Sequence, residues 1–372
     1  MTAKIKVLNI LGTRPEAVKM APIIKAMEID SAFECFTCAT AQHRELLDQV
    51  LNLFQIKPDI DLDLMKPDQS LSVLTTQILS NLDPVIKQLK PDWILAQGDT
   101  TTVMTAALLA YYNRVNFGHV EAGLRTFNNF EPYPEEVNRR IAGTIATVHF
   151  APTETAKNNL LKENVPSESI FVTGNTVIDA IQSVGKMPIP TELIILKNEI
   201  GSKKIILVTA HRRENFGEPI HSICTAIASL AKEFENEIHF VYPLHPNPNV
   251  KEVALNLLKD VPNVTLLPPL DYLPMVHLIK ASYLVLTDSG GLQEEAPGFG
   301  KPVLVMRNVT ERPEGIQAGT VRLVGTKTSQ IEEMVKKLLI DKNDYMSMAQ
   351  AVNPYGDGRA AGRILEVIKN FT

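Results

Sequence analysis

Short apolar runs alternate with helical patterns along almost the whole chain of 372 residues. Such runs are typical of buried parallel strands, whose crossover connections are usually helices. Strands are expected at 7–11, 35–39, 93–96, 115–120, 148–151, 170–172, 205–209, 238–242, 264–267, 283–287 and 303–306. Helices are expected at 101–112, 220–234, 292–298 and 359–371. The pattern predicts an α/β fold with parallel sheets.

The length of the chain favours two domains, at roughly 100–200 residues each. We place the seam near Gly174, so that residues 1–173 form an N-terminal Rossmann-like lobe and residues 174–355 a second one. The last stretch, 356–372, carries Ile364, Leu365, Ile368 and Phe371 on one helical face and is expected to complete the first lobe. Two doubly wound lobes of this kind predict a ligand-binding cleft between them.

Composition excludes several classes of function. The net charge is -5 and no basic run occurs, so neither nucleic acid nor a membrane surface is an expected partner. No apolar stretch approaches the roughly 20 residues that cross a bilayer. The first residues lead directly into a strand, so no signal peptide is expected and a cytoplasmic location is predicted.

Three cysteines cannot form a disulfide framework. Cys35 and Cys38 make a C-x-x-C pattern within an expected strand, where side chains three apart point to opposite faces. We interpret both as buried structural thiols. No His or Cys cluster has metal-ligand spacing, and neither a G-x-G-x-x-G nor a Walker A sequence occurs, so no metal and no dinucleotide cofactor are expected.

Two strand-to-helix junctions carry chemistry that suits an anion. In the first, Arg14 and Lys19 stand beside a helix start, where unpaired positive charge is unfavourable unless an anion is bound. In the second, Ser289 is expected to cap a helix while Gly290 and Gly291 let the backbone approach a phosphate, and Glu295 is placed to accept ribose hydroxyls. The alternatives are a surface salt bridge at the first junction and a simple cap and tight turn at the second.

Three acids in the first half are candidates for acid/base chemistry. Asp99 and Glu121 each follow an expected strand, and Glu135 follows Pro134 at an expected helix start. Each also has a structural alternative, namely a helix cap or a charge that complements a helix dipole. Three acids within one lobe nevertheless favour paired groups with separated pKa values, as proton transfer requires.

In the second half, His211, Arg212 and Arg213 follow an expected strand, and His245 follows the next one. His211 and Arg212 are candidates for contacts to an anionic substrate. The alternative is a hydrogen-bonded loop histidine with solvated arginines.

Together these motifs resemble the UDP-N-acetylglucosamine 2-epimerases, most closely the non-hydrolysing bacterial branch. The matching segments are 12–19, 41–44, 98–102, 119–126, 134–136, 211–214, 287–291, 310–314 and 353–358. The resemblance implies a GT-B arrangement of two lobes, with the C-terminal helix crossing back to the first. It also implies a homodimer that works without a cofactor.

The implied reaction is reversible conversion of UDP-GlcNAc to UDP-ManNAc for cell-surface polysaccharide, by elimination of UDP to 2-acetamidoglucal and re-addition. By this resemblance Asp99 would be the base that removes the proton from carbon 2. Glu121 and Glu135 would bind the glucal intermediate and return the proton. Arg14, Lys19 and His211 would assist the departure of UDP. The alternatives are a hydrolysing 2-epimerase that releases free ManNAc, a GT-B glycosyltransferase, and a catalytically silent UDP-sugar sensor.

Family members that their own substrate activates have a second UDP-GlcNAc site. The resemblance places a candidate effector site at Gln42 and His43, with Arg213 and His245. Glu45 and Asp68 depart from the family pattern, because some members carry Gln and Arg there. An acid that faces a diphosphate repels it, so the pattern leaves open whether this site works.

Overall fold

The computed structural model describes residues 4–40, 44–64 and 69–371. The chain forms two compact units: unit 1 is Met1–Ala180 with Tyr355–Thr372, and unit 2 is Ile181–Pro354. The first division between the units falls within a helix, Thr176–Val184, whereas the sequence placed the seam at 173/174.

Within the described residues, unit 1 contains a seven-stranded parallel sheet in the order β3-β2-β1-β4-β5-β6-β7. Its strands are β1 (Ile5–Leu11), β2 (Phe33–Ala39), β3 (Ile60–Asp61), β4 (Trp93–Gln97), β5 (Asn116–Val120), β6 (Val148–Ala151) and β7 (Ile170–Val172). Its helices are α1 (Arg14–Ile29), α2 (Arg44–Leu53), α3 (Leu71–Leu89), α4 (Thr101–Asn113), α5 (Glu135–Ile145), α6 (Glu154–Lys162), η1 (Ser167–Ser169), α7 (Thr176–Val184) and α16 (Ala360–Phe371). Chain order reverses between β1 and β4, which are neighbours in the sheet.

Unit 2 repeats this plan, with a six-stranded sheet in the order β10-β9-β8-β11-β12-β13 and the reversal between β8 and β11. Its strands are β8 (Lys204–Thr209), β9 (Ile238–Pro243), β10 (Val264–Leu267), β11 (Leu284–Thr287), β12 (Val303–Val305) and β13 (Val321–Leu323). Its helices are α8 (Thr191–Ile200), η2 (Arg213–Asn215), α9 (Glu218–Glu233), α10 (Pro248–Leu258), α11 (Tyr272–Ala281), α12 (Gly290–Glu295), η3 (Ala296–Phe299), α13 (Pro313–Gln317), α14 (Thr328–Ile340) and α15 (Lys342–Ala349).

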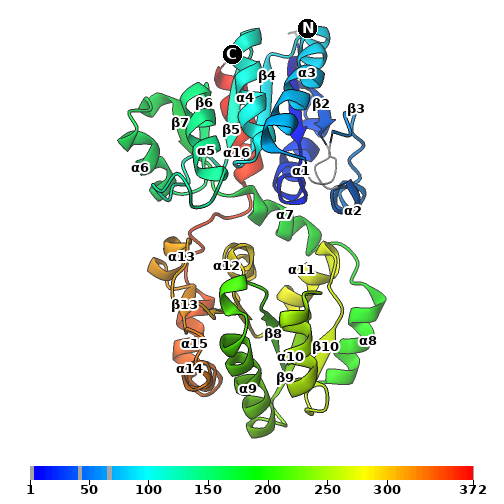
Figure 1. Cartoon of the computed structure of the whole chain (residues 1–372), viewed down its shortest axis with the longest axis vertical. Coiled ribbons are helices and arrows are strands. Elements are labelled where there is room, and N and C mark those ends of the chain that lie inside the picture. Colours follow the sequence, from blue (N-terminus) through cyan, green and yellow to red (C-terminus); the bar gives the residue numbers. More distant parts are fainter. Residues whose placement is uncertain (1–3, 41–43, 65–68, 372) are drawn as a thin grey trace. The chain divides into compact units, whose positions relative to one another are not determined.

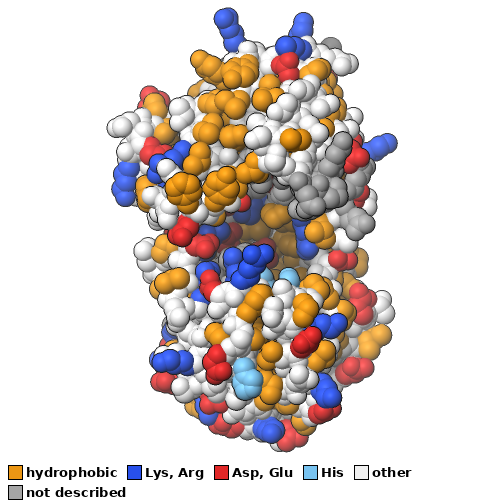
Figure 2. Space-filling view, viewed as in Figure 1, with side chains coloured by type: hydrophobic (Ala, Val, Ile, Leu, Met, Phe, Trp, Pro, Cys, Tyr) orange, Lys and Arg blue, Asp and Glu red, His pale blue; other side chains and the backbone are white. Residues whose placement is uncertain are grey.

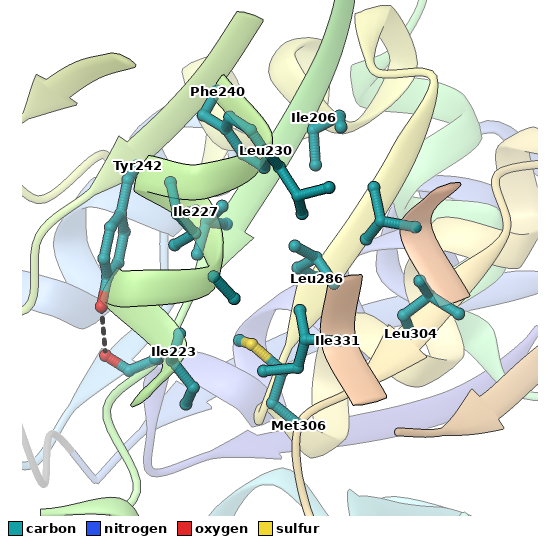
Figure 3. Packing of buried hydrophobic residues seen from close by; sticks show 14 of the residues in the cluster. Ile206, Ile223, Ile227, Leu230, Phe240, Tyr242, Leu286, Leu304, Met306 and Ile331 are labelled. Carbon is teal, nitrogen blue, oxygen red and sulfur yellow. Dashed lines mark hydrogen bonds between the residues drawn. The ribbon is translucent and has the colours of Figure 1, made fainter. Parts of the chain in front are cut away.

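Each sheet is buried on both faces, which explains why its strands read as continuous apolar runs rather than as an alternating pattern. In unit 2, Ile206, Phe240 and Leu286 pack on one face against α9, α10 and α14 (Figure 3). Their strand neighbours Leu207 and Val285 turn to the other face, where α8 and α11 cover them. The two-lobe α/β fold class is therefore confirmed.

The C-terminal helix packs within unit 1, as expected. Figure 1 shows α16, in red, among the strands and helices that the first half of the chain builds. It packs against α1, and Lys369 forms an ion pair with Asp30 at the end of that helix. The ring of Phe371 lies edge-on to Trp93, with ring centroids 5.7 Å apart. Burial of Ile364 and Ile368 confirms the predicted apolar face.

The predicted strands and helices are present, and most ends are exact or shifted by one or two residues. The helix predicted at 292–298 is instead divided into α12, which ends at Glu295, and the 3-10 helix η3. Two strands were missed: β3 has two residues and β13 has three, and both lie at sheet edges. Cys38 is buried and Cys35 partly buried, both are free thiols, and burial raises the pKa of each to about 12. The prediction of structural thiols fits this environment.

The surface carries both signs of charge. On the face seen in Figure 2, Lys and Arg side chains are interspersed with Asp and Glu over both units. Among the described residues, no helix has the length and hydropathy needed to cross a membrane.

Asp179 on α7 caps the N-terminus of α16. Its carboxylate accepts hydrogen bonds from the backbone N–H groups of Ala360 (3.2 Å) and Ala361 (3.0 Å), which have no partner within the helix. We expect Asp179→Ala to lower the free energy of unfolding of unit 1 by about 1–2 kcal/mol, as loss of a cap does. Denaturation followed by the fluorescence of the single tryptophan, Trp93 in β4, measures this change.

Two variants serve as controls for this measurement. Asp179→Asn keeps one acceptor oxygen and should be less destabilising than Asp179→Ala. Asn370→Ala alters an exposed position on α16 and should change stability by less than about 0.5 kcal/mol. Equal stability of Asp179→Ala and the unaltered protein would contradict the capping role.

Candidate functional site

Both predicted junctions lie where the chain order of a sheet reverses. In unit 1, Gly12 follows β1 and Asp99 follows β4, and these two strands are neighbours. In unit 2, His211 follows β8 and Ser289 follows β11, again on neighbouring strands. Ligands of open parallel sheets bind outside the carboxyl ends of the strands at this point. Each unit therefore has one candidate site at its reversal.

The first junction already contains a buried carboxyl group of its own. Glu16, in the first turn of α1, accepts hydrogen bonds from the backbone N–H groups of Gly12 and Thr13, both at 2.6 Å. The hydroxyl of Thr100 donates a third hydrogen bond to its other oxygen at 2.5 Å. These donors are therefore occupied, so an external anion would have to bind through side chains. Arg14 is placed for this, because it forms no ion pair within the described residues.

Asp99 is held beside β4 by residues of α5. Oδ2 of Asp99 accepts hydrogen bonds from Nε (2.8 Å) and forms an ion pair with Nη2 (2.7 Å) of Arg139. The backbone carbonyl of Asp99 accepts from Nδ2 of Asn138 at 2.9 Å. The preceding Gly98 has φ +89°, a conformation that favours glycine. One carboxylate oxygen is thus fixed, and Oδ1 forms no hydrogen bond among the described residues.

Glu121 follows β5, the next strand of the sheet, and is paired with Lys19. Oε2 of Glu121 lies 2.5 Å from Nζ of Lys19 and accepts from Nε2 of Gln97 at 2.6 Å. Its backbone has φ +64°, which is uncommon for a residue other than glycine and is frequent at functional sites. Lys19, expected beside a bound anion, therefore makes a largely buried ion pair with one of the three predicted acids.

Glu135 begins α5, as predicted, and its Oε2 is buried without a hydrogen-bond partner in the described part of the chain. Its neighbour Glu136 is fully buried and accepts hydrogen bonds from the backbone N–H groups of Thr126 (3.0 Å) and Phe127 (3.2 Å). Glu136 also contacts Nη1 of Arg139 at 3.2 Å. It therefore joins the loop before α5 to the arginine that holds Asp99.

His119, in β5, supports the same edge of the sheet. Its Nε2 lies 2.7 Å from the carbonyl oxygen of Gly98, the residue before Asp99. Burial lowers the pKa of His119 to about 4, so the ring is neutral at pH 7 and donates this hydrogen bond.

A buried carboxylate organises the candidate site of unit 2 as well. Oδ2 of Asp288 accepts hydrogen bonds from the backbone N–H groups of His211 and Arg212, both at 2.8 Å, and from Nδ2 of Asn215 at 3.0 Å. The hydroxyl of Tyr242 donates to the carbonyl oxygen of Ala210 at 3.3 Å, a contact drawn in Figure 3. The loop that presents His211 is thus fixed from two sides.

The His211 ring lies between Asp288 and His245. Nδ1 of His211 is 3.3 Å from Oδ1 of Asp288, and its ring stacks on His245 with centroids 5.6 Å apart. Burial lowers the pKa of His211, even though the Asp288 carboxylate acts in the opposite direction. His211 therefore enters a reaction at pH 7 mainly as a neutral hydrogen-bonding group.

Arg212 lies next to the glycine turn that the sequence predicts as a phosphate site. Its Nη2 is 3.6 Å from the position that a Cβ atom on Gly290 would occupy. Its Nε is buried without a hydrogen-bond partner among the described residues. Arg213, by contrast, is exposed on η2.

Ser289 stands at the N-cap position of α12, but its hydroxyl makes no cap hydrogen bond, so the predicted capping role is wrong. Its backbone N–H instead donates to Oγ1 of Thr287 at 2.9 Å. The hydroxyl is therefore not committed to its own helix. The Glu295 side chain folds back toward Gly291, with Oε1 3.9 Å from the position of a Cβ there.

The candidate effector site is only partly described. Gln42, His43 and Asp68 lie outside the described residues, and the side chain of Glu45 does too. Among the residues that the structure describes, no cluster of His, Cys, Asp and Glu is suited to a metal ion.

Sequence reasoning missed the groups that position the predicted residues: Arg139, Asn138, Gln97, Glu136 and Asp288. Gln97 and Asp288 end or follow buried strands, so the rule that located Asp99 also points to them. Arg139 lies 40 residues from its partner Asp99, and only the fold brings the two together.

Burial raises the pKa of Glu16 from 4.5 to about 7. A carboxyl group with a raised pKa stabilises the fold fully below its unfolded pKa, and this stability is lost as pH rises through the folded pKa. We expect the free energy of unfolding of unit 1, relative to that of Glu16→Gln, to fall by roughly 2–3 kcal/mol between pH 5 and 8. Urea denaturation followed by Trp93 fluorescence at pH 5, 6, 7 and 8 measures this difference.

Glu28→Gln is the matched control, because Glu28 lies on the exposed side of α1. Its difference from the unaltered protein should not depend on pH in this range. If the free energy of unfolding of Glu16→Gln also changed with pH in parallel with that of the unaltered protein, Glu16 would not have the raised pKa.

Comparison with known proteins agrees with this layout. Residues 25–369 match the family model described as UDP-N-acetylglucosamine 2-epimerase. The chain is 52% identical to the UDP-N-acetylglucosamine 2-epimerase of Salmonella typhimurium, covering 98% of this chain and 99% of that protein. It is also 52% identical to that of Escherichia coli K12, covering 98% of each.

A solved structure is similar along the whole length too. The crystal structure of UDP-GlcNAc 2-epimerase from Neisseria meningitidis bound to UDP-GlcNAc has 50% sequence identity and a TM-score of 0.87. The match covers 98% of this chain and 100% of that one. The chain therefore belongs to the UDP-N-acetylglucosamine 2-epimerase family.

Proposed function

We propose that this protein epimerises carbon 2 of UDP-N-acetylglucosamine reversibly, giving UDP-N-acetylmannosamine without hydrolysis. The observation that carries the proposal is the set of acids that follow β4 and β5 in unit 1, in a chain of this family. Asp99 and Glu121 follow neighbouring strands, and Glu135 begins the helix that holds Asp99 through Arg139. Inversion at carbon 2 requires one group to remove a proton and another to return it to the opposite face.

In the first step, Asp99 takes the proton from carbon 2. The electron pair of the C–H bond forms a double bond between carbons 1 and 2, while the bond from carbon 1 to UDP breaks. The products are 2-acetamidoglucal, UDP and a protonated Asp99. Arg139 leaves Oδ1 of Asp99 open for this proton while it fixes Oδ2. The carbon 2 proton is weakly acidic, so orientation of the base matters.

In the second step, UDP adds back to carbon 1 and carbon 2 receives a proton on the opposite face. Glu121 and Glu135 are the proposed groups for this transfer and for holding the glucal. Glu121 is oriented by Lys19 and Gln97, and Oε2 of Glu135 is a buried oxygen with unused capacity for a hydrogen bond. A group without a committed partner is suited to bind an intermediate.

UDP must stay bound between the two steps, and unit 2 carries the groups for this. Arg212, with the turn at Ser289, Gly290 and Gly291, would hold the diphosphate, and Glu295 the ribose. His211 would donate a hydrogen bond to the leaving oxygen. Arg14 and Lys19 of unit 1 would add positive charge as negative charge develops on UDP.

Further parts of the proposal rest on the family resemblance. We propose a cytoplasmic homodimer that supplies ManNAc units for cell-surface polysaccharide. Gln42, His43, Arg213 and His245 remain the proposed effector site.

Proton NMR of the full-length protein with UDP-GlcNAc tests the reaction. We expect a mixture of UDP-GlcNAc and UDP-ManNAc, with deuterium at carbon 2 when the solvent is D2O. Free ManNAc with UDP would identify a hydrolysing enzyme instead. Conversion only in the presence of a sugar acceptor would identify a glycosyltransferase, and absence of turnover with retained binding would identify a sensor.

Asp99→Asn tests the assignment of the base. An amide does not accept the carbon 2 proton, so we expect deuterium incorporation to fall by about 100-fold or more. UDP affinity, measured by calorimetry, should stay within about twofold, because unit 2 is proposed to hold the nucleotide.

The matched control is Asp83→Asn, a surface acid on α3, which should retain the exchange rate of the unaltered protein. Unchanged exchange in Asp99→Asn would remove Asp99 from the role of base. A parallel loss of UDP affinity would instead indicate damage to the fold.

A further inference from the structure

A cavity lies within unit 2, away from the residues of the proposed nucleotide site. It has a volume of about 550 Å³, within the range of small-molecule sites. It is bounded by residues 185–189, by α8, by the last turns of α11 and by Ile205 near the beginning of β8. His211 follows the other end of β8, and six residues of strand span about 20 Å. None of the residues assigned to the nucleotide lines this cavity.

The wall of the cavity is aliphatic. Leu193 and Leu196 of α8, Leu278 of α11 and Ile205 belong to the core between these helices and the sheet. Met187 and Ile189 add apolar surface from the connecting segment. The described lining contains no Phe, Tyr or Trp. Such a wall suits a flexible hydrocarbon chain, because burial of apolar surface is favourable and needs no particular geometry.

The charged groups around this wall all have the same sign. Lys186, Lys197 and Lys280 line the cavity, and the described lining includes no Asp or Glu. Nζ of Lys280 donates a hydrogen bond to the carbonyl oxygen of Gly185 at 2.6 Å, so the fold fixes the position of one of these cations. Three cations without a lining acid favour an anionic head group.

A buried polar side chain in the cavity wall has a nitrogen that is available for a hydrogen bond. His277 exposes 5% of its surface and lies in the cavity wall. Its Nε2 is buried and has no hydrogen-bond partner among the described residues. A buried polar atom without a partner is costly, so its presence in a cavity wall points to a ligand that satisfies it.

We propose that this cavity binds an amphipathic anion with an aliphatic chain, of which a medium-chain carboxylate is the simplest example. The chain lies against the leucines of α8 and α11, and the carboxylate lies among the three lysines. This site is independent of the UDP-sugar chemistry proposed above.

Decanoate, hexanoate and decyltrimethylammonium are the probes for this site in the full-length protein, each used below its micelle concentration. Calorimetry gives affinities, and NMR of methyl-labelled Leu and Met side chains gives the location. We expect decanoate to bind at least about tenfold more tightly than hexanoate, because each added methylene buries apolar surface. The cation, with the same chain length, should bind at least about tenfold more weakly than decanoate. Methyl signals of Met187, Leu193, Leu196 and Leu278 should shift.

Two variants probe the charges and the space separately. Lys186→Glu combined with Lys197→Glu should weaken decanoate at least about tenfold and favour the cationic probe. Ala281→Phe places a ring at an exposed position in the lining and should weaken both carboxylates. The matched control is Lys251→Glu combined with Lys342→Glu, on helices that belong to the opposite face of the sheet.

The results separate a specific site from adsorption. Equal affinity for the anionic and cationic probes, or shifts spread over other methyl groups, would overturn the proposal, as would absence of binding. Epimerase activity of all variants should match that of the unaltered protein, because the altered residues lie outside the proposed catalytic groups.

Discussion

A buried carboxylate that accepts backbone N–H donors organises the reversal point of each sheet. In unit 1, Glu16 occupies the donors of Gly12 and Thr13, and in unit 2, Asp288 occupies those of His211 and Arg212. Each of these hydrogen bonds contributes on the order of 1 kcal/mol, so that two or three together hold a loop in one conformation. Because these donors are occupied, a substrate phosphate at either reversal must be bound by side chains or by the beginning of α12. Arg14 and Arg212 thereby become more important than loop N–H groups.

The three candidate acids of unit 1 differ in how many hydrogen-bond and ion-pair partners the fold gives them. Asp99 is held by Arg139, and Glu121 by Lys19 and Gln97. Oε2 of Glu135 is buried without a partner in the described part of the chain. A base must be oriented before the reaction, whereas a group that stabilises an intermediate needs capacity that the intermediate alone satisfies. This difference in pairing supports Asp99 as the base and Glu135 as a contact to the glucal.

The fold was predictable because buried parallel strands leave a strong apolar signal. β6 and β10 have the predicted ends, whereas β3 and β13 are too short to produce such a run. The positions of Asp99, Glu121 and His211 were predictable too, because carboxyl ends of parallel strands meet at one edge. Which side chains pair with these residues was not predictable from the sequence. Lys19 and Glu121, for example, are 102 residues apart, and only the fold brings them together. The predicted capping of α12 by Ser289 was wrong, because its hydroxyl makes no cap hydrogen bond, and only its backbone N–H is engaged, by Oγ1 of Thr287.

The sheet of unit 2 also separates the two sites that we propose for this unit. Polar groups gather after the carboxyl ends of β8 and β11, where helix N-termini and loop N–H groups favour negative charge. The cavity beside α8 is lined by lysine side chains over an aliphatic wall, so its proposed selectivity for an anion rests on these lysines. Lysine charge is screened by salt, whereas apolar burial is not. Ionic strength should therefore weaken the anionic preference of this cavity while leaving its preference for longer chains in place.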